Sequence, residues 1–332
     1  MSLVECLLCP HRCRLVDYER GKCRVRVNLE GKLSTLVWGR VAALNIDPVE
    51  KKPLFHFLPG SRALSVATVG CNLACKFCQN YELSQRNPED EGSADWDYLP
   101  PEKLVELAVK RQVKSIAYTY SEPTIFYEYT RNSSALAGAK GIRNIMVTAG
   151  YIEREPLAKL LEVSHAFNTD LKALDDGYYR DICGGTLQPV LDGIVQTHQS
   201  PVWLELTNLL VPTLNDDPVW IRNLVRWVLA NVGPDVPLHF SRFFPCYRLE
   251  NLPPTPASTL DAAWQIAREE GLHYAYIGNI DHEGNHTYCP HCGTLLIRRR
   301  VYTILEFRLK VDVVSGKAYC SNCETEIAGV WA

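Results

Sequence analysis

The feature that most constrains this chain is a regular alternation of segment types in its middle part. Between residues 63 and 244, short β-prone runs alternate with stretches of helical period or composition, which is typical of βα units around a parallel sheet. We predict strands over 63–69, 115–118, 144–148, 166–170, 202–206 and 238–240, and helices over 101–111, 126–140, 155–163 and 218–232. Six such units predict an α/β fold, a partial (β/α)6 TIM barrel open on one side, although a doubly wound sheet would show the same alternation.

Length and charge bound the domain organisation. The 332 residues, 46% of them hydrophobic, can bury a sizeable core. We predict a Cys-rich metal-binding extension over 1–60, a core over 61–280 with a further helix near 258 and a strand over 274–277, and a zinc-ribbon-like module over 281–332. A net charge of -3 supplies no basic field for nucleic acid or an anionic membrane, and no apolar run reaches the roughly 20 residues of a bilayer span. We therefore expect a cytoplasmic protein.

The 13 cysteines are an odd and high number. A reducing cytoplasm argues against a disulfide framework, so metal ligation is the natural alternative. Four CxxC pairs occur, whereas random placement would give roughly half a pair. Cys183 and Cys246 alone stand outside three clusters, and because Cys246 follows the sixth predicted strand, a role at the barrel mouth stays open.

Cys71, Cys75 and Cys78 form a CxxxCxxC motif directly after the first predicted strand. Thiolates are the usual ligands of iron–sulfur clusters, and a cubane held by three of them leaves one iron open to a substrate or cofactor. The spacing therefore favours a redox-active [4Fe–4S] cluster. The alternative is a structural zinc site that lacks its fourth ligand.

Polar residues follow several predicted strands at their carboxyl ends, where parallel α/β barrels collect functional groups. They are Glu122, Thr148, Asp170 with Lys172, and Asn208. Asp170 and Lys172 are two residues apart on a strand and so project to the same face, with a surface ion pair as the alternative. Asn208 is equally compatible with a turn-forming role.

The C-terminal cysteines form two CxxC knuckles separated by 27 residues that contain β-prone runs, namely Cys289, Cys292, Cys320 and Cys323. This is the pattern of a zinc ribbon, with an auxiliary iron–sulfur cluster as the alternative. Gly293 can supply the positive φ often needed just past a knuckle. We expect His291 at the surface, because four cysteines already complete the site.

The N-terminal set also offers four thiolates, from Cys6, Cys9, Cys13 and Cys23. The segment is too short to build its own apolar core, which argues against cysteines without a metal. We expect either zinc or a second iron–sulfur cluster there.

The central motif, with the aromatic Phe77 before its last cysteine, resembles that of radical S-adenosylmethionine (SAM) enzymes. The resemblance implies that the amino acid end of SAM chelates the open iron. One electron then splits SAM into methionine and a 5′-deoxyadenosyl radical, which abstracts a hydrogen atom. It also implies that Phe77 packs near the cluster and the adenine, and that Glu122 holds the SAM amino group.

Other strand ends resemble those of glycyl-radical-enzyme activases. Thr148 begins a run similar to the Thr-Asn-Gly-Tyr turn of that family, with Ala149 in place of Asn, and Asn208 matches its fifth strand. Asp170 and Lys172 resemble its Asp-x-Lys motif. The resemblance implies cofactor contacts for these residues and a catalytic role for Asp170 and Lys172, near the ribose, the carboxylate or the substrate.

Over essentially its whole chain, the sequence is similar to the radical SAM enzyme of the AmmeMemoRadiSam system. The similarity is carried by residues 47–57, 120–126 and 288–290, while Val301 stands where a Gly is expected in a turn. It implies a [4Fe–4S] cluster, SAM, kinship with pyruvate formate-lyase activating enzymes, and Memo-like and AMMECR1-like partners. A flavodoxin- or ferredoxin-like protein is the expected electron donor.

The substrate stays open between a small molecule and a protein residue. A glycyl-radical-enzyme activase is the alternative within the enzyme class. A non-catalytic iron–sulfur or zinc protein, acting in electron transfer or as an adaptor, is the alternative outside it.

Overall fold

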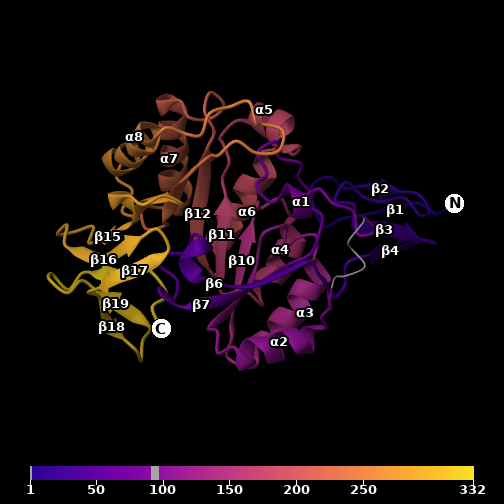
Figure 1. The fold of residues 1–332 in the computed structure, drawn as a ribbon, viewed down its shortest axis with the longest axis horizontal. Coiled ribbons are helices and arrows are strands. Elements are labelled where there is room, and N and C mark those ends of the chain that lie inside the picture. Colours follow the sequence, from indigo (N-terminus) through magenta and orange to yellow (C-terminus); the bar gives the residue numbers. More distant parts are fainter. Residues whose placement is uncertain (1, 91–96) are drawn as a thin grey trace.

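The computed structural model describes residues 2–90 and 97–332, and its centre is an eight-stranded sheet in the order β14-β13-β12-β11-β10-β9-β7-β6 (Figure 1). Seven strands are parallel: β7 (Arg62–Ala67), β9 (Ser115–Tyr118), β10 (Arg143–Thr148), β11 (Ala166–Asp170), β12 (Trp203–Leu210), β13 (Leu238–Arg242) and β14 (Ala275–Gly278). In the described part of the chain β14 and β6 are the sheet edges, so the barrel does not close. The predicted α/β fold, a partial barrel open on one side, is confirmed, and the seventh parallel strand, β14, is the one predicted over 274–277.

The remaining strand, β6 (Ala43–Pro48), pairs antiparallel with β7 from Ala43↔Ala67 to Pro48↔Arg62. It lies inside residues 1–60, which we assigned to the N-terminal extension. The central sheet therefore begins before residue 61, because β6 has its hydrogen-bonding partner in the core.

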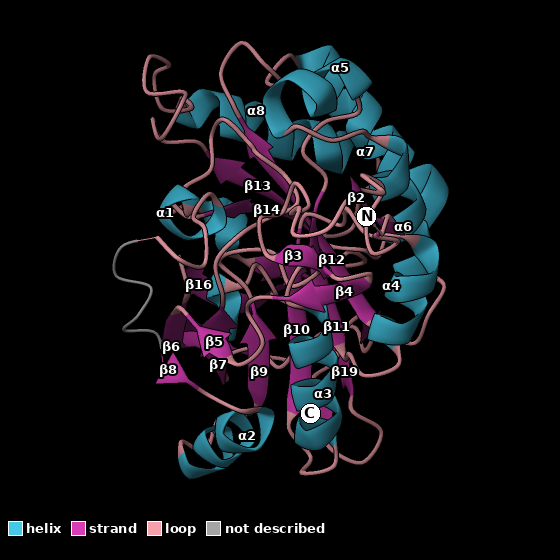
Figure 2. Cartoon of the chain, turned by 90° about the vertical axis from the view of Figure 1, so that its right-hand side faces the viewer, coloured by secondary structure: helices cyan, strands magenta, loops and turns pink. Residues whose placement is uncertain are grey.

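The helices that connect successive strands pack against the sheet (Figures 1 and 2). They are α2 (Pro101–Lys110), α3 (Tyr127–Gly138), α4 (Arg154–Leu161), α6 (Gln188–His198), α7 (Pro218–Val232) and α8 (Ala257–Glu269). Helix α7 shows why they form: the Asp217 side chain accepts from the Val219 N–H, Pro218 occupies the first turn, and an apolar stripe is buried. Helix α6 is missing from our prediction. None of the described helices has both the length and the apolarity needed to cross a membrane.

Short helical turns complete the connections of the sheet. They are η1 (Val49–Lys51), α1 (Tyr81–Ser84), α5 (Asp176–Tyr178), η3 (Tyr179–Cys183) and η4 (Glu283–Asn285). The π turn η3 ends at Gly184, whose φ of 78° suits a residue without a Cβ.

The N-terminal part consists of small two-stranded pairs: β1 (Val4–Glu5) with β2 (Arg14–Leu15), β3 (Arg26–Leu29) with β4 (Lys32–Thr35), and β5 (Arg40–Val41) with β8 (Asp97–Tyr98). Its buried residues Cys6, Cys23 and Val25 belong to the same apolar cluster as the barrel core. Figure 1 shows this part and the C-terminal module at opposite ends of the long axis.

The C-terminal module contains two three-stranded sheets. These are β15 (Thr287–Tyr288), β16 (Leu295–Arg300) and β17 (Thr303–Phe307), then β18 (Lys310–Asp312), β19 (Lys317–Tyr319) and β20 (Glu326–Ile327). The module packs on Phe55 and Tyr276 of the core. The buried guanidinium of Arg299 strengthens this contact, since its Nη2 donates to the Phe55 carbonyl (2.8 Å) and its Nη1 to Thr287 Oγ1 (2.7 Å).

Candidate active site

The loop that follows β7 carries the three central cysteines. It starts at Gly70, whose φ is 91°, and a Cβ there would lie 2.7 Å from the Cys23 carbonyl oxygen. Both the backbone conformation and the close approach therefore require glycine. Further along, the Ala74 N–H donates to the Cys183 carbonyl (2.8 Å), so that η3 fixes the course of the loop.

Cys71, Cys75 and Cys78 all line one cavity of about 460 Å³, which is within the usual size of ligand pockets. Burial raises the pKa of the Cys71 thiol well above its ordinary value, and the nearby charge of Glu122 adds to this. The positive charge of a bound metal would favour the thiolate there.

The donor set fits an iron–sulfur cluster with one open iron, because one loop brings three thiols to the cavity and no other cysteine of the described residues lines it. In residues 2–90 and 97–332, a different group, the C-terminal cysteines, is the one whose ligand atoms converge around a single-ion position. This speaks against the alternative of a zinc site at the triad.

Glu122 is buried in the same cavity and is held by its neighbours. Its Oε1 accepts from the Thr124 N–H (3.0 Å) and from Thr148 Oγ1 (2.7 Å), and its Oε2 accepts from the Ala149 N–H (2.9 Å). A carboxylate offers about four acceptor positions, so about one is left for a ligand. Thr148 therefore orients Glu122, and Ala149 contributes through its backbone where its side chain cannot.

Asp170 and Lys172 also line the cavity, on the shared face expected from their spacing. Lys172 Nζ donates to Asp170 Oδ2 at 2.7 Å and lies 5.5 Å from the centroid of the Phe77 ring. The Lys172 side chain is 9% exposed, so the pair is not an ordinary surface ion pair. Phe77 is itself buried and faces the same space.

Asn208 lies elsewhere than predicted. Its neighbours Thr207 and Leu209 line the cavity, whereas the Asn208 amide donates to the carbonyls of Leu171 (2.8 Å) and Lys172 (3.1 Å). Because side chains alternate along a strand, Asn208 faces away from the cavity and holds the backbone that carries Lys172. The expectation of a direct cofactor contact is therefore corrected to a positioning role, and Thr207 takes its place in the wall.

A charged cluster at the edge of the cavity was not among the predicted site residues. Lys52 Nζ donates to Asp47 Oδ2 (2.7 Å) and lies 4.5 Å from the centroid of the Tyr120 ring, while Tyr120 Oη and Ser65 Oγ donate to the same carboxylate oxygen. Burial lowers the pKa of Lys52 to about 8. Asp47 and Lys52 lie in the run 47–57, which we used only as evidence of family resemblance. Their contact with Tyr120 exists only in the folded structure.

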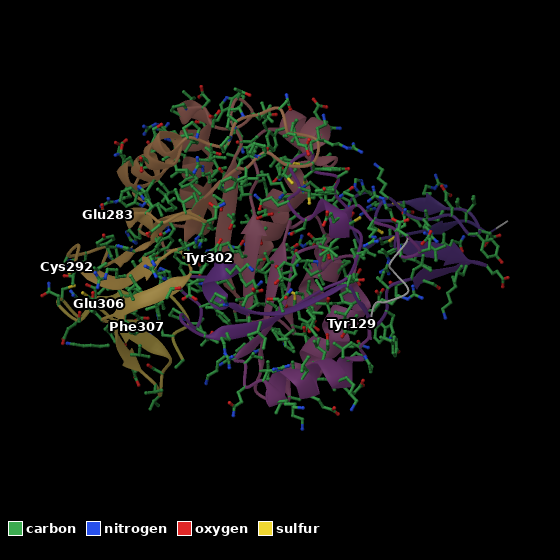
Figure 3. The ribbon with its side chains drawn as sticks, viewed as in Figure 1. Tyr129, Glu283, Cys292, Tyr302, Glu306 and Phe307 are labelled. Carbon is green, nitrogen blue, oxygen red and sulfur yellow. The ribbon has the colours of Figure 1, made fainter. Side chains whose placement is uncertain are left out.

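The C-terminal module also reaches the cavity, through Tyr302 (Figure 3). This residue follows Val301, which has a φ of 52° in the tight turn between β16 and β17. A β-branched residue is strained at positive φ. Val301 therefore occupies a turn position that suits glycine, as the family resemblance predicted.

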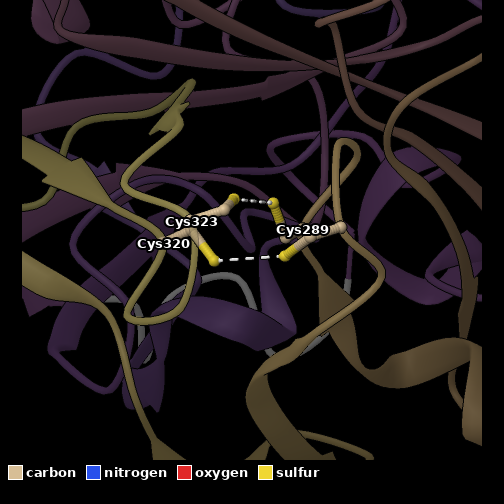
Figure 4. A group of neighbouring side chains, drawn as sticks. Cys289, Cys320 and Cys323 are labelled. Atoms are coloured by element: carbon tan, nitrogen blue, oxygen red, sulfur yellow. Dashed lines mark hydrogen bonds between the residues drawn. The ribbon is translucent and has the colours of Figure 1, made fainter.

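The four C-terminal cysteines converge as the zinc-ribbon pattern predicts (Figure 4). The Sγ atoms of Cys289 and Cys323, and those of Cys292 and Cys320, lie 3.6 Å apart, close to the roughly 3.8 Å edge of a tetrahedron with 2.3 Å zinc–sulfur bonds. Gly293 has the predicted positive φ, 70°. His291 is exposed, as expected.

The other cysteines lie outside the main cavity. Cys6, Cys9, Cys13 and Cys23 line a separate small cavity in the N-terminal part. The Cys246 thiol donates to the Cys78 carbonyl (3.5 Å) without lining the 460 Å³ cavity, and Cys183 is buried under the central loop.

Comparison with known proteins agrees with this geometry. The family profile of the Radical SAM superfamily matches residues 65–223. An uncharacterized protein of Methanocaldococcus jannaschii is 44% identical over 310 residues, which cover 93% of this chain and 91% of that protein.

Among solved structures, SuiB of Streptococcus suis bound to S-adenosylmethionine is similar with a TM-score of 0.51 and 14% identity, over 70% of this chain and 53% of that chain. A domain of pyruvate-formate lyase-activating enzyme from Bacteroides vulgatus is 16% identical with a TM-score of 0.45, over 50% of this chain and 99% of that one. The likeness to SuiB shows the fold. The matched profile shows that residues 65–223 form a domain of the Radical SAM superfamily, and such a domain implies an enzyme of the radical SAM class.

Proposed function

We propose that the chain binds a [4Fe–4S] cluster through Cys71, Cys75 and Cys78 and cleaves SAM reductively to abstract a hydrogen atom from a substrate. The observation that carries the proposal is that three thiols, two carboxylates and three ammonium groups, one of them that of Lys172, open onto one cavity. When bound, the cluster supplies one electron and SAM supplies the 5′-deoxyadenosyl radical.

The residues of the cavity divide the work of holding SAM. The free acceptor position of Glu122 suits the SAM ammonium group, because the other positions are occupied by Thr124, Thr148 and Ala149. Asp170 and Lys172 offer an acceptor and a donor to the ribose and the carboxylate of SAM. The ring of Phe77 covers the apolar side of the same space.

The test is anaerobic reconstitution with iron and sulfide, followed by dithionite and SAM, with 5′-deoxyadenosine measured by mass spectrometry. Wild type should form it, and Cys75→Ala should not. Cys246→Ala is the matched control, because it removes a thiol outside the cavity wall and should retain product formation. A reconstituted wild type that forms no 5′-deoxyadenosine would refute the proposal.

We also propose that the C-terminal cysteines hold one structural zinc ion. A closed site of four thiolates fits a tetrahedral ion that stabilises the module. Elemental analysis should find that Cys292→Ser/Cys323→Ser loses zinc and keeps the iron of the triad. Loss of iron instead would contradict the assignment to zinc.

The finer assignment is to the enzyme of the AmmeMemoRadiSam system, located in the cytoplasm, with Memo-like and AMMECR1-like partners and a flavodoxin- or ferredoxin-like donor. Its support is the run 47–57, whose Lys52 lines the cavity and pairs with Asp47, and whose Phe55 packs in the apolar cluster of the C-terminal module. Deuterium transfer into 5′-deoxyadenosine from labelled candidate small molecules, or from a glycyl-radical partner, distinguishes the substrate classes. Copurification with tagged chain tests the partners, and their absence would count against the subgroup.

A further inference from the structure

The N-terminal cysteines meet at one place although they come from separate turns. The Cys6 N–H donates to the Cys13 carbonyl (2.9 Å), and a Cβ on Gly21 would lie 3.5 Å from Cys13 Sγ and 3.8 Å from Cys23 Sγ. Cys9 lines the same small cavity as these three. Cys6, Cys9 and Cys23 are buried, and Cys13 is partly exposed.

The hairpin that carries the first three cysteines has little structure of its own, although Cys6, Leu8 and Cys23 pack on the barrel core. Its strands have two residues each, which is too few for independent stability. The four cysteines are free thiols in the structure, so disulfides do not cross-link them. A shared inorganic centre would supply such a cross-link.

The C-terminal cysteines show how sulfur atoms are arranged around a position that suits a single metal ion, and the N-terminal set can be compared with them. The C-terminal sulfurs approach to 3.6 Å in pairs, as four ligands of a single ion do. Across residues 2–90 and 97–332, no other set of three or more cysteine, histidine or carboxylate ligands converges in this way. The N-terminal set therefore resembles the central triad, where each thiolate would bind a different iron of one cluster.

His11 does not add a fifth ligand. Its Nε2 lies 2.7 Å from the Asn72 carbonyl oxygen, and its Nδ1 lies 3.4 Å from Lys22 Nζ. The four cysteines thus complete the ligand set of a cubane, and no iron is left open for SAM or substrate. Such a centre can store an electron but cannot bind SAM.

The location places this centre against the loop of the catalytic triad. The amide side chain of Asn72 hydrogen-bonds Cys9 and lies 4.0 Å from Cys71 Sγ, so one side chain separates a thiol of each set. Gly70 packs on the Cys23 carbonyl from the other side. The two cysteine sets are therefore parts of one packed unit.

We propose that Cys6, Cys9, Cys13 and Cys23 hold a second [4Fe–4S] cluster, fully ligated by the chain, beside the triad loop. It takes up one electron from an external one-electron reductant and passes from the 2+ to the 1+ state, with no bond made or broken. The inference goes beyond the proposed function, since SAM cleavage requires the triad alone.

The test uses full-length chain reconstituted anaerobically, with iron and zinc counted per chain and electrons counted by dithionite titration. Cys71→Ala/Cys75→Ala/Cys78→Ala should retain half of the wild-type iron, take up one electron where wild type takes up two, and give an electron paramagnetic resonance signal that SAM does not change. A triad variant with no iron and an additional zinc ion would overturn the proposal.

The reciprocal variant, Cys6→Ser/Cys9→Ser, should lose the other half of the iron and keep a signal that SAM changes. If this variant is insoluble, the triad variant still decides, because its N-terminal set is intact. A wild type with two clusters but no response to SAM would refute the proposed function and leave this inference standing.

Discussion

The side chain of Glu122 allows a sharp test of how the cavity holds SAM. Glu122→Gln keeps the shape of the side chain but replaces one carboxylate oxygen by an NH2 group and removes the negative charge. The amide oxygen can still accept from Thr124 and Thr148, which share one oxygen in the wild type. The NH2 group then faces the Ala149 N–H, which loses its acceptor.

The substitution should change both the free energy of unfolding and the affinity for SAM, for different physical reasons. The orphaned Ala149 N–H and its donor–donor contact should lower the free energy of unfolding by about 1–3 kcal/mol. A charge-assisted hydrogen bond to an ammonium group contributes about 1.5–3 kcal/mol, so the Kd for SAM should rise roughly 10- to 150-fold.

The reconstituted variant is titrated anaerobically with SAM. Binding is monitored by calorimetry or by the change in the paramagnetic signal of the reduced cluster. Iron content is measured in parallel, so that loss of the cluster is not mistaken for weak binding. Glu155→Gln is the matched control, since it removes an exposed carboxylate that pairs with Lys159 on α4. Its Kd should equal that of wild type.

If Glu122→Gln, with full iron content, binds SAM as tightly as wild type, Glu122 does not hold the SAM ammonium group. The carboxylate would then serve only to fix the β10 turn through Thr148 and Ala149.

Other perturbations probe the scaffold around the cavity. Val301→Gly should raise the free energy of unfolding by about 1 kcal/mol in chemical denaturation, because glycine relieves the positive φ. Glu205→Gln should lower it by about 2–3 kcal/mol, since the fully buried carboxylate accepts two backbone N–H groups and lies 2.7 Å from a His239 ring nitrogen. Burial alone would raise the pKa of Asp47, but Lys52 and nearby hydroxyls hold it well below its ordinary value. The pKa of Asp47 is lower in the folded chain than in the unfolded chain. The charged carboxylate therefore contributes stability above about pH 4, and this contribution is lost as the pH falls further. Asp47→Asn should therefore be less stable at pH 7 and lose less stability on acidification, and an unchanged acid profile would contradict this.

Much of the site is predictable because it depends on local spacing. The CxxxCxxC loop brings its thiols together within eight residues, and Asp170 and Lys172 share a face whichever strands lie beside them. The zinc-ribbon knuckles are local in the same way, with Gly293 adopting the positive φ that its position suggests.

The errors arise where a side chain's direction depends on partners distant in sequence. Asn208 and Thr207 are adjacent polar residues, and their pattern alone does not say which faces the cavity; the pairing of β12 between β11 and β13 decides it. The apolar and polar residues of helix α6 do not form a pattern clear enough to predict a helix. The helix is stabilised by burial of its apolar residues in the folded chain.

By itself, then, the sequence determined the α/β class, the central triad and the outer cysteine sets, because period and short spacing are local properties of the chain, whereas the strand order of the open barrel came from the structure. Tertiary structure alone decided that Lys52, held by Asp47, and Tyr302 share a cavity with the triad. It also decided that Cys23 packs on Gly70 and Cys9 on Asn72. These contacts join segments dozens to hundreds of residues apart, so they exist only once the core has folded.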